Sequence, residues 1–175
     1  RPRSFDTACA PLHNAIVQEH SMSIVTQDHI DQYNDRGFFV LERVIPDHHL
    51  EMLRAECTRY IGMIESEMDR QGADVIGINH RGKRYFISNR YKESAHIASF
   101  IFSEVMADIC RATLGPSAYL FHEQYVVKAA EKGMKFGWHQ DSGYVGYDHK
   151  PYLTCWCTLD DVTVENGTVF MLPYE

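Results

Sequence analysis

The sequence predicts an α+β fold in which helices come first and short antiparallel strands follow. Before Pro116 the apolar residues recur at helical spacing, and after it the pattern changes to the alternation of short strands. An Asn166-Gly167 pair separates the last two expected strands, as a tight turn between strands requires. Helices grouped before strands are typical of α+β proteins, and a row of short strands favours a sandwich or a jelly roll.

Length and composition favour a single domain without a nucleic-acid partner. The chain has 175 residues, of which 45% are hydrophobic, which is enough for one core. The 24 acidic residues outnumber the 17 Lys and Arg, so the formal charge is -7, and no basic run is present. Such a surface does not track a phosphate backbone, so we expect no nucleic-acid partner.

Hydropathy argues against a membrane partner and favours a cytoplasmic location. No apolar run approaches the roughly 20 residues that cross a bilayer, and the N-terminus lacks the apolar stretch of a secretory signal. The five cysteines follow no regular spacing, which favours reduced thiols. The sequence carries no signal for an oligomeric state.

The domain is expected over residues 22–175, after a leader. Residues 1–21 show neither helical periodicity nor caps, and Met22 stands at a natural place for an initiator. We expect this leader to be disordered or foreign to the domain. A targeting peptide is the alternative, but Asp6 and Glu19 interrupt the basic amphipathic pattern that it needs.

The first helix is expected between Thr26 and Gly37. Thr26 is a good N-cap, Ile30 and Tyr33 are spaced for one face, and Gly37 ends the helix. A short strand is expected next, over the apolar residues 38–44.

A longer helix is expected from an N-cap at Asp47 to Gly72, and a third one ends at Gly115-Pro116. Between them lie the turn-rich residues 74–94. The core face of the long helix carries Leu50, Leu53, Cys57, Tyr60, Ile61, Ile64 and Met68. The core face of the third helix carries Ile97, Phe100, Ile101, Val105, Ile109 and Ala112.

The strands are expected over residues 118–127, 135–141, 152–160 and 168–172. In the second of these, His139 and Asp141 are two residues apart and so point to the same side of a strand. An imidazole and a carboxylate on one side, joined by a later histidine, make the two-histidine, one-carboxylate site that holds Fe(II) and leaves positions open. A His-x-Asp tripeptide alone arises often by chance, so the hypothesis of a metal site depends on the sequence around it.

That context resembles a known family. The segments "GWHQD", "CWCTLDD" and "ENGTVFMLP" are similar to the phytanoyl-CoA dioxygenase family of Fe(II)- and 2-oxoglutarate-dependent oxygenases, and the resemblance runs from about Asp28 to the end. It includes the early segment "GFFVLERVIPDHHLEMLR" and the "LGP" before the first expected strand. The resemblance implies N-terminal helices packed on a double-stranded β-helix, the jelly-roll or cupin-like core, which is incomplete in this chain.

The resemblance also implies a site. His139 and Asp141 take the places of the first two iron ligands, and the third, a distal histidine, is expected beyond Glu175 together with a basic residue for 2-oxoglutarate. Trp156 would line the 2-oxoglutarate pocket, and Gln124 would face the co-substrate or the substrate. We therefore read the chain as a truncated fragment that is inactive alone.

The implied activity is oxidation of an unactivated C–H bond in a small molecule, with O2 consumed and succinate and CO2 as co-products. Tyr144, Tyr147 and His149 could border the substrate, although such loop residues more often pack over a sheet edge. His149 is also an unfavoured substitute for the third ligand.

Three further interpretations stay open, one for the basic residues and two for the function. Lys83, Arg84 and Arg90 could meet an anionic substrate, although basic residues in a polar loop are usually solvated. An inactive jelly-roll binding module is the alternative function. A zinc hydrolase is less favoured, because no His-Glu general base accompanies His139 and Asp141.

Overall fold

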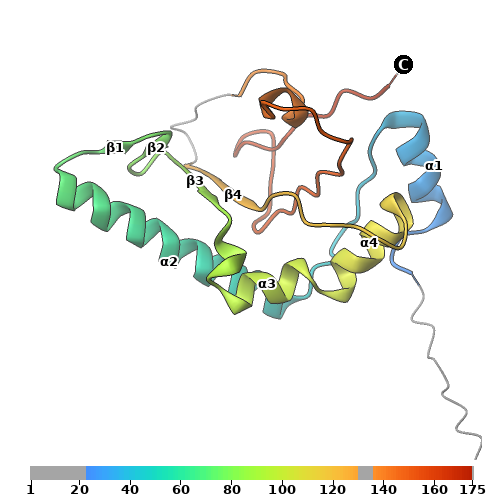
Figure 1. The fold of residues 1–175 in the computed structure, drawn as a ribbon, viewed down its shortest axis with the longest axis horizontal. Helices are drawn as coiled ribbons and strands as arrows, with labels where there is room; N and C mark the ends of the chain where they lie inside the picture. The colour runs from blue at the N-terminus through green and yellow to red at the C-terminus, as the bar shows by residue number, and fades with distance from the viewer. Residues whose placement is uncertain (1–22, 130–135, 175) are drawn as a thin grey trace, which may run out of the picture.

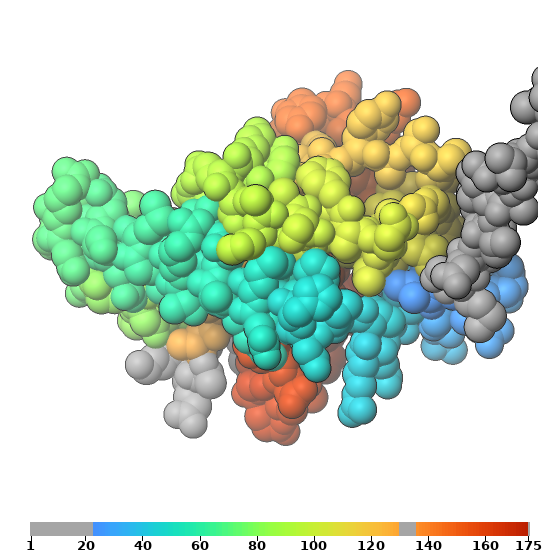
Figure 2. Space-filling model, turned by 90° about the horizontal axis from the view of Figure 1, so that it is seen from below, coloured from blue at the N-terminus to red at the C-terminus, as the bar shows by residue number. Residues whose placement is uncertain are grey.

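Helices and a small antiparallel sheet form the framework of the computed structural model, which describes residues 23–129 and 136–174 (Figure 1). The leader expected over residues 1–21 lies outside the described residues. In Figure 1 the helices α2, α3 and α4 lie along the lower side of the molecule, and most of residues 136–174 lies above them. Figure 2 looks at this helical face from below and shows α2 and α3 side by side. The predicted α+β class is confirmed.

Helix α1 (Gln27–Arg36) begins and ends where the sequence predicts. The Thr26 hydroxyl accepts from the backbone N–H of His29 at 3.4 Å, and His29 Nδ1 accepts from the N–H of Thr26 at 3.1 Å, which makes a capping box. Gly37 ends the helix in the left-handed region at φ 85°.

The strand expected over residues 38–44 is wrong, because no strand forms there. Phe39 instead packs back on α1, with its ring 5.4 Å from that of His29 and 6.1 Å from that of Tyr33. Phe39 thus covers the first helix instead of contributing to a sheet.

Helix α2 (Asp47–Gln71) is the longest element and ends at Gly72, as predicted. Asp47 is its first residue rather than its N-cap, because Pro46 occupies the capping position and its carbonyl accepts from the N–H groups of His49 and Leu50. Its buried face includes Leu53, Tyr60 and Met68, which the helical spacing assigns to the core.

The third predicted helix is divided in two. Helix α3 (Ala95–Ile101) is capped by Ser94, whose hydroxyl accepts from the N–H of Ile97 at 3.2 Å, and α4 (Glu104–Leu114) begins after Ser103. Ser103 has an extended backbone at ψ 162°, a conformation that serine favours at a helix start. The apolar spacing continues across the break, which is why the sequence reads as one helix.

The sheet has four antiparallel strands in the order β1-β2-β3-β4. Their bounds are Val75–Ile76, Asn79–His80, Arg84–Ser88 and Gln124–Lys128, and the 3-10 turn η1 (Arg90–Lys92) follows β3. The first three strands lie in the segment predicted to be turns. The β3–β4 pairing places Tyr85 opposite Val127 and Ile87 opposite Tyr125.

The core lies between the helices and one face of this sheet. Its buried members are Leu53, Tyr60, Tyr85, Ile87, Ile97 and Phe100. Tyr125, Val127, Cys157 and Leu159 pack against them in partly buried positions. The opposite face of the sheet bears Phe86, whose ring lies 5.8 Å from that of Phe136, and Lys128, which binds the Gly167 carbonyl.

The jelly roll is not confirmed. Of the strands expected after Pro116, only β4 forms, and within the described residues no strand forms over 136–141, 152–160 or 168–172. Asn166 and Gly167 form the expected turn, with Gly167 at φ 102°, but the turn does not join two strands. Extended segments become strands only when a neighbour accepts their backbone hydrogen bonds, and these segments have no such neighbour in the described chain.

Large apolar side chains are exposed mainly in residues 119–174. Tyr119, Trp138, Tyr144 and Leu172 are among the most exposed. None of the described helices has the length and apolar character needed to span a membrane.

Candidate metal centre

His139 and Asp141 lie next to each other, as predicted, but on a different local structure. His139 follows a bend in an irregular part of the chain, and Asp141 is the first residue of the 3-10 turn η2 (Asp141–Tyr144). Gln140 between them has extended backbone angles of φ -112° and ψ 135°. His139 Nε2 lies 3.6 Å from Asp141 Oδ1. The prediction of a strand here is wrong, but the two side chains face each other.

The ring of His139 is oriented by the chain just before it. Its Nδ1 lies 2.7 Å from the Gly137 carbonyl oxygen, which can only accept, so Nδ1 carries the proton. In the neutral ring Nε2 then carries the lone pair with which imidazole binds a metal ion, and this nitrogen faces the carboxylate. The Tyr144 ring packs edge-on against that of His139, with centroids 5.4 Å apart.

The carboxylate of Asp141 has two different environments. Oδ2 accepts a hydrogen bond from the Thr154 hydroxyl at 3.1 Å, whereas Oδ1 faces His139. Two atoms that each lie about 2.1 Å from one ion can be at most about 4.2 Å apart, and the 3.6 Å separation meets this condition. The pair therefore fits as two ligands of one metal ion.

Within residues 23–129 and 136–174, His139 and Asp141 form an incomplete metal site. No cluster of three or more His, Cys, Asp or Glu side chains suited to a metal ion occurs among them. His149, the unfavoured substitute ligand, has its Nδ1 3.0 Å from the Tyr147 carbonyl. The structure thus brings together two of the expected ligands and does not supply a third.

An open depression lies beside His139. It has a volume of about 710 Å³, within the range of small-molecule sites. Its lining residues are His139, Gln140, Ser142, Gly143, Tyr144, His149 and Pro151. Of the residues expected to border a substrate, Tyr144 and His149 line it, and the Tyr147 ring lies 6.4 Å from that of His149.

Two aromatic residues that the sequence did not single out support this wall. The Phe121 ring stacks on that of Tyr152 at 4.9 Å and on that of His149 at 6.5 Å. Phe121 precedes β4, and Tyr152 follows the depression, so only the fold brings them together. No local pattern in the sequence signals this contact.

Gln124 and Trp156 are not joined to the His139–Asp141 pair. Gln124 is the first residue of β4, and its Nε2 donates to the Ser88 hydroxyl at 2.8 Å across the β3–β4 pairing. Trp156 is 49% exposed. Neither lines the depression, so their roles toward a co-substrate stay predictions.

The residues on either side of Trp156 face inward. Cys157 packs against the core, and burial raises its thiol pKa. Burial also raises the pKa of Cys155, to about 12, with a smaller effect from the neighbouring Cys157 and Cys110. These thiols are protonated at neutral pH and are packing groups rather than ligands.

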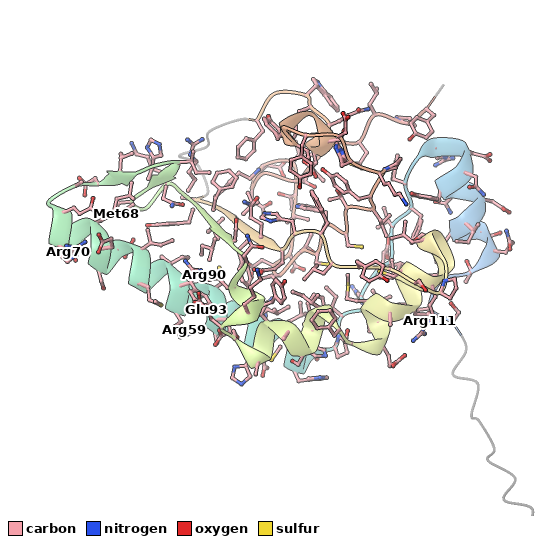
Figure 3. The ribbon with its side chains drawn as sticks, in the orientation of Figure 1. Arg59, Met68, Arg70, Arg90, Glu93 and Arg111 are labelled. Atoms are coloured by element: carbon pink, nitrogen blue, oxygen red, sulfur yellow. The ribbon has the colours of Figure 1, made fainter. Side chains whose placement is uncertain are left out.

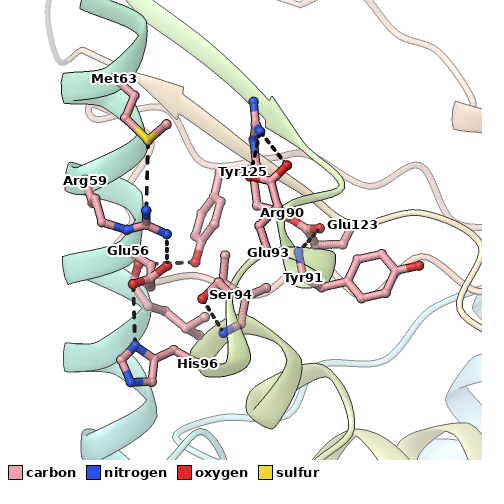
Figure 4. Close-up of polar contacts among 12 residues, drawn as sticks. Glu56, Arg59, Met63, Arg90, Tyr91, Glu93, Ser94, His96, Glu123 and Tyr125 are labelled. Carbon is pink, nitrogen blue, oxygen red and sulfur yellow. Dashed lines mark hydrogen bonds and ion pairs between the residues drawn. The ribbon is translucent and has the colours of Figure 1, made fainter.

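Two of the three basic residues expected to meet an anionic substrate, Arg84 and Arg90, have partners within the chain. Arg84 Nε donates to the Ile78 carbonyl at 3.0 Å. Arg90 Nη1 donates to both carboxylate oxygens of Glu93, at 3.1 and 3.2 Å (Figure 4). These contacts favour a structural role for both arginines over binding of a substrate.

The comparisons with known proteins give a family. A family model described as Phytanoyl-CoA dioxygenase (PhyH) matches residues 33–175, which include His139, Asp141 and the lining of the depression. A search of the curated proteins found no match, and a search of the solved structures found none either.

Proposed function

Because the chain belongs to the phytanoyl-CoA dioxygenase family, we propose that it forms part of an Fe(II)- and 2-oxoglutarate-dependent dioxygenase. Family members are typically oxygenases, so an oxidoreductase is the class that this membership supports. The proposed reaction hydroxylates, or otherwise oxidises, an unactivated C–H bond of a small-molecule substrate. Succinate and CO2 are the co-products.

The observation that carries this proposal is the His139–Asp141 pair at the edge of the depression. An imidazole nitrogen and a carboxylate oxygen 3.6 Å apart are the donor types of a non-haem Fe(II) site. We propose that a histidine beyond Glu175 completes the set. When bound, Fe(II) with 2-oxoglutarate and O2 would supply the oxidising power.

The chain itself supplies orientation. The Gly137 carbonyl fixes the tautomer of His139, and Tyr144 covers one edge of its ring. The depression gives a substrate access to the metal-binding edge of the pair, beside Tyr144 and His149. Gln124 and Trp156 are proposed to bind 2-oxoglutarate, as the resemblance implies. Positioning of this kind is the protein's part in cofactor chemistry.

The test is an anaerobic titration of the protein, including any chain beyond Glu175, with Fe(II) and 2-oxoglutarate. We expect a metal-to-ligand charge-transfer absorption band in the wild type and none in His139→Ala or Asp141→Ala. His122→Ala is the matched control, because His122 is exposed and distant in sequence from the pair, and it should keep the band. A band that survives His139→Ala contradicts the metal assignment.

A second assay separates an enzyme from an inactive binding module. Candidate compounds are added to the Fe(II)-loaded protein, and succinate formation is measured for each. Stimulation of succinate formation by one compound identifies a substrate class. A protein that binds a compound in the depression without making succinate, even with 2-oxoglutarate bound, is a binding module.

A further inference from the structure

We propose that Thr154 is a positioning residue for Asp141, and that it selects Oδ1 as the oxygen presented beside His139. This inference rests on the proposed metal site. Thr154 touches neither of the donor atoms itself, since its hydroxyl binds the other carboxylate oxygen, Oδ2, at 3.1 Å. It acts through Asp141.

Asp141 needs such a partner because its own segment does not hold it. The side chain is 52% exposed, and η2 is a single short turn outside the sheet. An exposed aspartate interchanges its two oxygens freely by rotation about its last side-chain torsion, which is broad. A hydrogen bond to one oxygen makes the two oxygens inequivalent, and only Oδ1 then faces His139 Nε2.

Thr154 is able to act as a fixed point because its own segment is attached to the core. Cys157 and Leu159, on the same segment, pack against the buried cluster, and Arg54 Nε donates to Asp160 at 3.1 Å. Cys155 and Cys157 turn inward while Thr154 and Trp156 are exposed, so the hydroxyl is on the outward side. Threonine is also stiff at its first side-chain torsion, which limits where the hydroxyl can point.

The test compares Thr154→Val, which keeps the shape and removes the hydroxyl, with Thr154→Ser, which keeps the hydroxyl. Binding of Co(II) alone is followed by visible absorption, which reports both affinity and coordination and does not depend on turnover. Loss of a partner that orients a ligand typically weakens metal binding by about 10- to 100-fold. We therefore expect Thr154→Val to weaken Co(II) binding at least about tenfold and to alter the absorption bands, and Thr154→Ser to recover most of the affinity.

Thr158→Val is the matched control, because Thr158 lies further along the same segment, and it should bind Co(II) like the wild type. Thermal unfolding of the metal-free proteins is measured in parallel. A positioning role leaves the midpoint of Thr154→Val close to that of Thr158→Val. A large drop in the midpoint that Thr154→Ser does not restore indicates a structural role and overturns the proposal.

The remaining outcomes separate this inference from the proposed function. If Asp141→Ala abolishes Co(II) binding while Thr154→Val binds it as tightly as the wild type does, the metal site stands and the role of Thr154 is wrong. If Asp141→Ala keeps full affinity, the metal site itself is wrong, and the role of Thr154 falls with it.

Discussion

The two described parts of the chain differ in how much of their backbone is hydrogen-bonded in helices and strands. Residues 23–129 form four helices and a four-stranded sheet around one buried cluster. Residues 136–174 contain only the turn η2 as a regular element, expose many apolar side chains, and nevertheless carry the candidate metal centre. The candidate metal centre therefore depends on a framework that is built mainly by residues 23–129.

A few specific contacts join the second part to the first. Lys128 Nζ donates to the Gly167 carbonyl at 3.0 Å, and Arg54 pairs with Asp160. The N–H of Tyr174 donates to the Arg36 carbonyl at 3.1 Å. Substitutions in the framework, in these links and in the exposed segment should therefore have unequal effects on stability.

The largest expected effect appears when the same substitution, Leu to Ala, is made in each of the two parts. Leu53→Ala removes a side chain that is 3% exposed and should lower the free energy of unfolding by about 2–5 kcal/mol, through lost burial and a cavity. Leu172→Ala, at 79% exposure, should change it by no more than about 0.5 kcal/mol. Urea unfolding measures both. Equal losses would mean that the second part is packed as tightly as the first.

A second effect comes from Glu56, whose pKa lies at about 2 instead of 4.5, chiefly because Arg59 donates to it at 2.7 Å. His96 Nδ1 also lies 3.4 Å from it (Figure 4). A lowered pKa in the folded state means that this stabilisation is complete above pH 4.5 and is lost as the pH falls toward 2.

Glu56→Gln should thus lower the free energy of unfolding by about 1–3 kcal/mol at neutral pH. This gap between wild type and variant should close as the pH falls. The control is Glu67→Gln on the same helix, which breaks a similar but exposed pair with Arg70 and should cost less (Figure 3 labels Arg59 and Arg70). Unfolding curves across the acid range measure the gap. A gap that does not change with pH contradicts the assignment.

The third prediction tests the contact between Gly37 and the Tyr174 ring. Gly37→Ala places a Cβ in the left-handed region, at a cost of about 1–2 kcal/mol, and also 2.8 Å from a Tyr174 ring carbon. Gly72→Ala has the same backbone cost at φ 62° but meets open space. Gly37→Ala should therefore be the more destabilising of the two by thermal unfolding. Adding Tyr174→Ala should remove the difference if the ring is its cause.

The smallest expected effect is at Lys128. Lys128→Met keeps the apolar stem and removes the hydrogen bond to Gly167, which should cost no more than about 1 kcal/mol. Because this bond holds the turn at Asn166-Gly167, the change should appear locally. Hydrogen exchange at the Thr168 amide, which donates to the Thr163 carbonyl at 3.0 Å, should become faster while amides of β3 are unaffected.

Features set by neighbouring residues could be predicted from the sequence. The caps at Thr26, Gly37 and Gly72 depend on local backbone chemistry, and all three are confirmed. His139 and Asp141 meet because they are close in the chain, and this holds although the strand that was expected to carry them does not form.

Features set by distant residues could not be predicted. Strand β3 contains Arg84 and follows a turn, and most of its length is paired with the distant strand β4. The Thr154–Asp141 bond and the Phe121–Tyr152 stack likewise join separate segments. The roles of Gln124 and Trp156, the cytoplasmic location and the absence of nucleic-acid and membrane partners stay predictions.

The alternation along β3 and β4 has a consequence for insertions and deletions. Tyr125 and Val127 face the core, whereas Gln124 and Lys128 flank them, with Gln124 bonded to Ser88 on the opposite face. A single residue gained or lost inside β4 would exchange the two faces of the strand on one side of the change, so Tyr125 or Val127 would leave the core. The connection between the two strands is constrained where α3 places Ile97 and Phe100 in the core, so changes in length should be tolerated better in its irregular residues 115–120 than within α3 or β4.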